Sequence, residues 1–314
     1  MTLDPALLAL LQFVPKEVPA SIDWAAQRAS AAALVPMITG PEPQTEVASV
    51  EAHEVEGRAG PVHLRVYRPT TSTTATVAFF HGGGWTVGDL NTVDHTVRFL
   101  CEALPAVVVS CTYRLAPDHP FPAAYEDALA AAQWVLRHAS ELGGDPGRVA
   151  IAGDSAGGNL AAAVAIGLRD AARSQGEVQP LSAQLLLYPC VDLRDEAWSF
   201  PSRITDADPS LNVRILRATA EAYIAGGDTS DWRLSPLAVD DVSDLPPALV
   251  VVHTVDPLRD EAVAYADRLR EASVDVEVME IPNLTHGFIH LRRLVPAAAE
   301  AADAVVARFR EFLK

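Results

Sequence analysis

Cysteine is scarce in this sequence, with three residues among 314: Cys101, Cys111 and Cys190. An odd number of cysteines without metal-ligand spacing gives no basis for a disulfide framework or a zinc site. Cys111 and Cys190 end the apolar runs AVVVSC and LLLYPC. Buried cysteines behave as small apolar side chains, so we expect inert thiols rather than a redox site.

Long apolar runs are also absent from the sequence. No stretch approaches the about 18–20 residues that are needed to span a bilayer. The N-terminal run MTLDPALLALLQF carries Asp4 and no basic residue before its apolar part, whereas a secretory signal peptide begins with a basic region. We therefore expect a cytoplasmic protein without a membrane partner.

Basic residues are few, since 24 Lys and Arg stand against 41 Asp and Glu and give a formal net charge of −17. Such a charge repels phosphates, which argues against nucleic acid and anionic membrane surfaces as partners. It also disfavours a strongly anionic substrate, although a local pocket can differ from the whole surface. The simplest interpretation is that the acidic surplus keeps the protein soluble.

The pattern of apolar residues predicts a single α/β domain over residues 1–314. Alternation in Val62–Tyr67, next to His53–Glu56, predicts an antiparallel pair of strands. Beyond this pair, short apolar runs alternate with helical segments, which indicates a parallel sheet buried on both faces. Val274–Ile281 suits an edge strand, and a helix near 297–313 follows it. The other runs are Val77–Phe80, Ala106–Cys111, Val149–Ala152, Ala183–Tyr188 and Ala248–Val252, with helices near 91–103, 121–141, 157–173 and 259–273.

Two helical regions lie outside this alternation. Residues 3–14 and Ser21–Met37 precede the first strand, and Ser21 is a plausible N-cap for the second of these helices. A later, irregular region has helical character near Val213–Ile224. We expect the two regions to form a helical cap over the catalytic part of the domain. The cap would comprise about 1–45 and about 193–227.

A candidate nucleophile lies in the run Gly153-Asp154-Ser155-Ala156-Gly157. It follows a predicted strand and precedes an Ala-rich helix, the setting of a G-x-S-x-G elbow. There a strained backbone lifts the serine hydroxyl above the sheet, and the flanking glycines avoid collisions that a Cβ would cause. An incidental serine in a Gly-rich connection is the alternative. The run lacks the Gly-x-Gly-x-x-Gly of a dinucleotide loop and the Gly-Lys-Ser/Thr ending of a P-loop.

A glycine loop, His81-Gly82-Gly83-Gly84-Trp85, follows the apolar strand that ends at Phe80. Its consecutive glycines allow backbone N–H groups to turn toward one point. The N–H groups of Gly83, Gly84 and Ala156 could together hold the oxyanion of a tetrahedral intermediate. A flexible turn is the alternative. We expect His81 to anchor this loop rather than to act as a base.

A carboxylate and a base follow the serine in chain order. Asp256 comes after a predicted strand and is either an orienting carboxylate or the N-cap of the next helix. His286 lies in a loop after the last strand, and His290 is the fallback. Asp260 and Glu261 suit the dipole of the first helical turn and are expected to be structural. The order Ser…Asp…His is that of α/β-hydrolases.

These motifs resemble the bacterial hormone-sensitive-lipase-like family of carboxylesterases, close to plant carboxylesterases and arylacetamide deacetylase. The resemblance runs from about Val77 to Phe288 and includes Tyr113-Arg114-Leu115-Ala116-Pro117, His119-Pro120-Phe121-Pro122-Ala123-Ala124 and Tyr188-Pro189. It implies an α/β-hydrolase fold, with a mostly parallel eight-stranded sheet flanked by helices and covered by a helical cap. It also implies a triad of Ser155, Asp256 and His286 and an oxyanion hole of Gly83, Gly84 and Ala156.

Four further residues are candidates for the surroundings of this site. Trp85 either lines the pocket or packs, and Tyr188 and Phe288 are possible substrate contacts. His253 departs from the resemblance, because family members usually carry a small residue there. It either crowds the Asp256 loop or is a packed core histidine, and we favour the core.

The sequence therefore predicts a serine carboxylesterase for short-to-medium acyl esters, with a small-molecule substrate and no metal or organic cofactor. Amide or lactone hydrolysis by the same triad stays open. A non-catalytic receptor, as in the gibberellin receptors that resemble this family, is disfavoured because those proteins typically lose the histidine. We expect a monomer or a homodimer.

Overall fold

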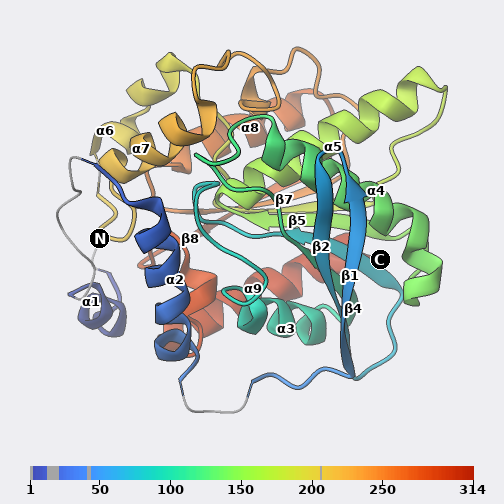
Figure 1. Cartoon of the computed structure of the whole chain (residues 1–314), viewed down its shortest axis with the longest axis horizontal. Coiled ribbons are helices and arrows are strands. Elements are labelled where there is room, and N and C mark those ends of the chain that lie inside the picture. Colours follow the sequence, from blue (N-terminus) through green and yellow to red (C-terminus); the bar gives the residue numbers. More distant parts are fainter. Residues whose placement is uncertain (1–2, 13–20, 41–43, 206) are drawn as a thin grey trace.

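The computed structural model describes residues 3–12, 21–40, 44–205 and 207–314. An eight-stranded sheet forms its centre, with helices on both faces (Figure 1). The strands are β1 (Ser49–Gly57), β2 (Gly60–Arg68), β3 (Ala75–Phe80), β4 (Ala106–Cys111), β5 (Val149–Asp154), β6 (Ala183–Leu187), β7 (Ala248–His253) and β8 (Val276–Ile281).

The strand order is β1-β2-β4-β3-β5-β6-β7-β8. The pairs β1–β2 and β2–β4 are antiparallel, and every pair from β4 to β8 is parallel. This confirms the prediction of a mostly parallel eight-stranded sheet. The sixth strand ends at Leu187 rather than at the predicted Tyr188, because Tyr188 takes a left-handed backbone with φ of 38°.

Helices cover the two faces of the sheet as the alternation of apolar runs predicted. α4 (Ala123–Leu142), α5 (Ala156–Ser174) and α8 (Arg259–Glu271) pack on one face, and α3 (Asp94–Ala103) and α9 (Pro296–Phe312) pack on the other (Figure 1). The alanines of α5 allow this helix to lie against the sheet with most of its residues buried. Parallel strands need apolar cover on both faces, and these helices supply it.

The three cysteines are free and buried, which confirms the prediction for them. Cys101 lies on α3, Cys111 ends β4 and Cys190 follows β6. Burial raises the pKa of Cys101 to about 12. Its thiol therefore stays protonated near neutral pH and is a poor nucleophile.

The first two helices are shorter than predicted at their N-terminal ends. α1 spans Pro5–Leu11, and residues 13 and 14 of the predicted helix lie outside the described residues. α2 spans Trp24–Thr39, and its N-cap is Asp23, whose carboxylate accepts the N–H of Ala26 at 3.0 Å. The prediction of Ser21 as the N-cap was wrong, because the helix begins three residues after it and Asp23 supplies the acceptor.

The region 193–227, which we call the inserted segment, joins β6 to the part of the chain before β7. It contains the short helices η1 (Asp195–Ser199) and α6 (Pro201–Thr205) and the longer α7 (Val213–Ile224). Asn212 caps α7 by accepting the N–H of Ile215 at 3.0 Å. α7 has the bounds that the helical pattern predicted.

A buried ion pair fastens the inserted segment to the domain. Arg203 of α6 donates to the carboxylate of Glu261 in the first turn of α8, and both side chains are fully buried. The other oxygen of Glu261 accepts the N–H groups of Val191 and Asp192 at 2.8 and 3.2 Å. Beside it, Asp260 accepts the N–H of Ser202 at 2.8 Å. The two acidic residues of this turn thus have the structural role that was expected of them.

Removal of Arg203 tests this attachment. Arg203→Met leaves the Glu261 carboxylate buried without its cation, so the free energy of unfolding should fall by about 3–5 kcal/mol. Urea unfolding followed by circular dichroism measures the change. Lys314→Met, which removes an exposed pair with Glu311, is the matched control and should leave the unfolding midpoint in place. Equal midpoints for the two variants would contradict the anchoring role.

Candidate active site

The predicted site residues lie on loops that leave the carboxyl ends of parallel strands. Phe80 of β3 pairs with Gly153 of β5, so the His81 loop and the Ser155 turn begin side by side. His253 of β7 pairs with Ile281 of β8 in the same way. Carboxyl ends of parallel strands meet at one edge of a sheet, where α/β proteins bind their ligands.

Ser155 sits at a sharp turn between β5 and α5. Its backbone has φ of 54° and ψ of −118°, a conformation that non-glycine residues rarely adopt. The turn is held because the Ser155 N–H donates to Leu187 at 2.9 Å, while its carbonyl accepts from Asn159 and Cys190. The predicted strand–turn–helix setting is therefore present, with the strain that the motif required.

The glycines on either side of Ser155 are required by close backbone contacts. A Cβ at Gly153 would collide with the carbonyl of Gly157. A Cβ at Gly157 would collide in turn with the carbonyl of Phe80 at the end of β3. Any larger residue would therefore force the turn away from the sheet and move the hydroxyl.

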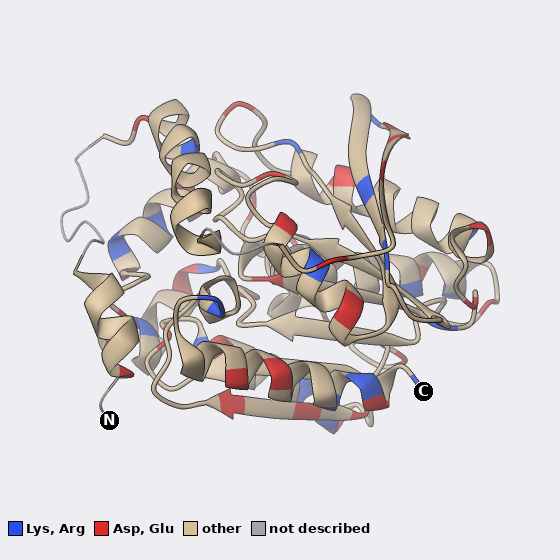
Figure 2. Cartoon of the chain, turned by 90° about the horizontal axis from the view of Figure 1, so that it is seen from below, with Lys and Arg blue, Asp and Glu red and all other residues tan. Residues whose placement is uncertain are grey.

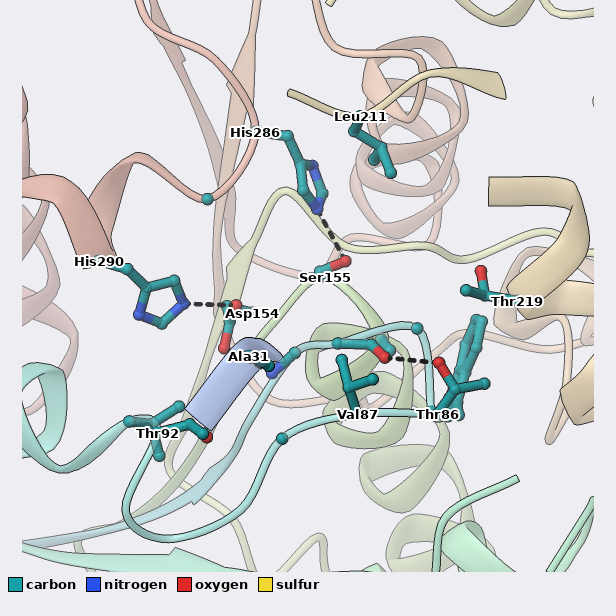
Figure 3. Close-up of a pocket in the computed structure, with 18 of the residues that line it drawn as sticks. Ala31, Thr86, Val87, Thr92, Asp154, Ser155, Leu211, Thr219, His286 and His290 are labelled. Carbon is teal, nitrogen blue, oxygen red and sulfur yellow. Dashed lines mark hydrogen bonds and ion pairs between the residues drawn. The ribbon is translucent and has the colours of Figure 1, made fainter. Parts of the chain in front are cut away.

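The structure brings together the three residues that were predicted as a triad. The Nε2 atom of His286 lies 2.8 Å from Oγ of Ser155, and Nδ1 lies 2.8 Å from Oδ2 of Asp256 (Figure 3 shows the first contact). With the proton on Nδ1, the imidazole donates to Asp256 and accepts from the serine hydroxyl. Ser155 lies 131 residues before His286 in the chain and Asp256 lies 30 residues before it, yet both contact the same imidazole ring.

The electrostatics of this pair favour a charged imidazole. Asp256 is fully buried, which alone would raise its pKa, but the charge of His286, the hydrogen bond from that ring and the nearby His253 hold the pKa well below its usual range. Oδ1 of Asp256 also accepts the N–H of Leu258 at 2.8 Å. Burial lowers the pKa of His286, but the Asp256 carboxylate outweighs it and the net shift is upward.

His253 is packed in the core, as we favoured from the sequence. It is fully buried at the end of β7, and its ring lies 5.0 Å from that of Phe288 and 5.1 Å from that of Tyr188. Its Nδ1 atom also lies 3.4 Å from Oδ2 of Asp256. The residue therefore lies near the same carboxylate oxygen that His286 contacts, without displacing His286.

Gly83 and Gly84 of the glycine loop line the same cavity as Ser155. Gly83 and Gly84 have positive φ of 112° and 57°, and the turn closes because Thr86 and Val87 donate to the Gly83 carbonyl. No hydrogen bond among the described residues uses the N–H of Gly83 or Gly84. Ala156 begins α5, where N–H groups of the first turn have no partner within the helix.

His81 fixes the start of this loop. The ring is buried and stacks on Tyr113 at 4.3 Å, while the Tyr113 hydroxyl donates to the His81 carbonyl at 2.8 Å. Burial lowers the pKa of His81, so the ring is neutral. His81 thus occupies the anchoring position expected of it. Arg114, the residue after Tyr113, donates two hydrogen bonds to the carboxylate of Asp127 on α4. These bonds hold the turn that precedes α4.

His290 belongs to a different pair. Its Nε2 atom lies 3.0 Å from Oδ2 of Asp154 and its Nδ1 atom 2.9 Å from Oγ1 of Thr96 (Figure 3). The other Asp154 oxygen accepts the N–H of Gly82 at 2.8 Å. The suggestion of His290 as the fallback base is therefore corrected, because this ring is committed to Asp154 and holds the base of the glycine loop.

A cavity of about 380 Å³ opens above Ser155 and His286. Its floor includes the glycine loop, and its walls come from α2 and from the inserted segment around α7. Most of the wall is apolar. The wall residues on these two regions are Trp24, Gln27, Ala31, Leu34, Val35, Ile38, Leu211, Ile215, Leu216 and Thr219.

The three suggested substrate contacts differ in position. Trp85 lines the cavity and also packs, since its ring stacks on Tyr223 at 4.5 Å. Tyr188 and Phe288 are buried and lie outside the cavity wall, so the expectation of substrate contact is corrected for both. Tyr188 instead packs against the ring of His286 at 4.6 Å, which places it behind the histidine.

Sequence reasoning missed two residues near the site. Arg28 is the only charged residue of α2, and it donates to the carbonyls of Thr86 and Ala116 at 2.8 Å each and to Asp118 at 2.6 Å. A lone arginine in an apolar helix is a signal that could have identified it. Asp208, in the inserted segment, accepts the backbone N–H of His286 at 2.7 Å. No local pattern marked that residue.

The charged residues are spread over the surface of the domain. Figure 2 shows acidic residues along α9 and the neighbouring β8 at the edge of the sheet. Among the described residues, no helix has both the length and the apolar character for crossing a bilayer. The expectations of no nucleic acid and no membrane partner stay predictions.

Known proteins resemble the chain over nearly its whole length. Residues 77–290 match the family described as alpha/beta hydrolase fold. Carboxylic ester hydrolase LipN of Mycobacterium tuberculosis is 39% identical over 99% of this chain and 84% of its own length. Carboxylesterase NlhH of the same organism is 38% identical over 99% of this chain and 96% of its own.

Solved structures agree with the sequence comparison. The hyperthermophilic esterase from the archaeon Pyrobaculum calidifontis superposes with a TM-score of 0.88 at 35% identity, covering 99% of both chains. The match in fold, the full-length similarity to named ester hydrolases and the geometry of the Ser155 turn point to one conclusion. This chain belongs to the hormone-sensitive-lipase-like carboxylesterases of the α/β-hydrolase fold.

Proposed function

We propose that this carboxylesterase hydrolyses esters through an acyl-enzyme formed on Ser155, with His286 as the base and Asp256 as the residue that orients it. The observation that carries the proposal is the unbroken line of contacts from the serine Oγ through the imidazole to the buried carboxylate, at 2.8 Å each. A hydroxyl is a weak nucleophile at neutral pH, and an adjacent oriented base is what activates it.

In the first half of the reaction, Oγ of Ser155 attacks the ester carbonyl while Nε2 of His286 takes the hydroxyl proton. Asp256 stabilises the imidazolium that forms. The proton then passes from Nε2 to the leaving alcohol, and the acyl group stays on the serine. In the second half, His286 takes a proton from a water molecule as its oxygen attacks the acyl carbonyl. The proton then passes from Nε2 to Oγ of Ser155 as the acyl–Oγ bond breaks and the acid leaves.

The oxyanion of both tetrahedral intermediates would be held by the N–H groups of Gly83, Gly84 and Ala156. The positive φ values of the two glycines and the start of α5 support this assignment. The position of α5 adds the positive end of a helix dipole. One such donor typically contributes about 10²–10³ in turnover. None of these steps requires a metal or an organic cofactor.

The substrate we propose is a small ester with a short-to-medium acyl chain. The cavity of about 380 Å³ lies at the small end of ligand sites, and its apolar walls suit an uncharged chain. We propose that about 1–45 and about 193–227 act as a cap of the single domain, since both regions supply wall residues. A cytoplasmic location and a monomeric or homodimeric state stay predictions.

Two alternatives are separable by experiment. Amide or lactone hydrolysis would use the same residues, and turnover of matched ester, amide and lactone substrates distinguishes them. A binding-only protein would not need His286 in contact with both a serine and a buried carboxylate. The contacts in this chain therefore favour catalysis.

Substitution of the nucleophile is the first test. Ser155→Ala should lower kcat on a p-nitrophenyl ester by ~10⁶, by analogy with deletions in other serine triads. Ser174→Ala, at the other end of α5 and exposed to solvent, is the control and should keep wild-type activity. Near-full activity of Ser155→Ala would show that another group attacks the ester.

The pH dependence of kcat/KM tests the base. His286 must be neutral to accept the proton, and its pKa lies above the ordinary 6.5, so activity should rise with pH around a midpoint above that value. Asp256→Asn removes the charge that raises this pKa. It should move the midpoint to lower pH and reduce kcat by ~10⁴, as in a serine protease triad. A flat profile between about pH 6 and 8 would count against His286.

A series of p-nitrophenyl esters tests the assigned substrate. With acyl chains from acetate to laurate, kcat/KM should be highest for short or medium chains and fall for the longest, which are too large for a cavity of about 380 Å³. Each methylene buried against the cavity walls adds about 0.8 kcal/mol of binding free energy until the acyl chain fills the cavity. A steady rise up to laurate would contradict the proposed chain length.

A further inference from the structure

Asp208 is a buried carboxylate that the triad mechanism does not use. It lies in the inserted segment between α6 and α7, with 2% of its surface exposed. A buried carboxylate is costly unless it is hydrogen-bonded and its charge is compensated. Its contacts therefore show what it does in the molecule.

The hydrogen bonds of Asp208 converge on the peptide of the proposed base. Its Oδ2 atom accepts the N–H of His286 at 2.7 Å. Its Oδ1 atom accepts the N–H and the hydroxyl of Ser210 at 2.7 and 2.6 Å. The same hydroxyl lies 3.2 Å from the His286 carbonyl. The inserted segment thus contacts the His286 backbone at both its N–H and its carbonyl.

The ion pairs of the described residues bear on how the charge of Asp208 is compensated. Among the described residues, no Lys or Arg forms an ion pair with this carboxylate. Burial and the neighbouring charge of Asp256 raise the pKa of Asp208, while its hydrogen bonds from His286 and Ser210 oppose that rise. The charge of the His286 ring also lowers the pKa of Asp208, so the two groups attract each other when the ring is protonated.

We propose that Asp208 is a positioning residue by which the inserted segment holds His286 in line with Ser155 and stabilises its protonated form. This inference rests on the triad proposed above. It gives the inserted segment a second role, because Leu211 and Ile215 of the same segment line the cavity. The region that contacts the substrate is thus also the region that fixes the base.

Several charged groups face the His286 ring and set its protonation together. Asp256 has the largest effect, and Asp208 and Asp154 add to it in the same direction, against the effect of burial. His253 lies next to Asp256, with its Nδ1 atom 3.4 Å from Oδ2. The contribution of Asp208 is therefore separable only by changing Asp208 itself.

The test uses Asp208→Asn and Asp208→Ala in the full-length enzyme. The asparagine keeps an oxygen that can accept the His286 N–H but removes the charge, so the midpoint of the kcat/KM pH profile should fall by about one unit, as expected for loss of a nearby opposite charge. The alanine also removes the acceptor. We expect kcat to fall about 10- to 100-fold with KM changed less than about threefold, since the contact acts on the base rather than on substrate affinity.

Asp192→Asn is the matched control. Asp192 is a buried carboxylate directly before the inserted segment, but it pairs with Arg194 at 2.8 Å and not with the His286 loop. Its pH midpoint should equal that of the wild type. Ser210→Ala keeps the Asp208 charge, so it should lower kcat and leave the midpoint of the kcat/KM pH profile unchanged. If Asp208→Ala does not fold, Ser210→Ala replaces it as the test of positioning.

A folded Asp208→Asn enzyme with the wild-type kcat and midpoint would overturn the proposal. So would an equal midpoint shift in Asp192→Asn, because the effect would then not be specific to the Asp208 carboxylate. Failure of the triad gives a different result. In that case Ser155→Ala would remain active, whereas failure of the Asp208 proposal leaves that variant inactive.

Discussion

The backbone strain at Ser155 is the constraint on which the rest of the site depends. A serine at φ of 54° is held there by a hydrogen bond to Leu187 on β6 and by contact of the two flanking glycines with neighbouring backbone. Strain of this kind costs of order 1–3 kcal/mol and persists only where surrounding structure fixes it. Here the parallel sheet and α5 fix it, so the large core of the domain maintains the position of one hydroxyl.

The remaining parts of the site reach this hydroxyl along separate routes. The sheet register brings in the glycine loop, which Asp154 and His290 hold at its base. The loop after β8 brings in His286, backed by Tyr188. Arg28 ties α2 to the carbonyl of Thr86, beside the glycine loop, and Asp208 ties the inserted segment to the His286 loop. α2 and the inserted segment, which form the cavity walls, are therefore each hydrogen-bonded to a loop of the site.

The sequence predicted the parts that are encoded locally. The G-x-S-x-G turn, the glycine loop and the alternation of apolar runs each depend on neighbours in the chain, and the fold and the meeting of Ser155, Asp256 and His286 followed from them. Contacts between distant segments carried no such signal. Asp208 lies in an irregular region 78 residues before its partner. Tyr188 and Phe288 were misplaced because chain position near a site does not say which way a side chain points.

We propose that one strained serine hydroxyl, in contact with His286, is the nucleophile. Treatment of the folded enzyme with an organophosphonate, followed by mass mapping of its peptides, tests this most directly. We expect one phosphonyl group per chain, on the peptide that contains Ser155, with activity lost in parallel. Loss of activity with the label on another residue, or folded and active protein that takes up no label, would contradict it.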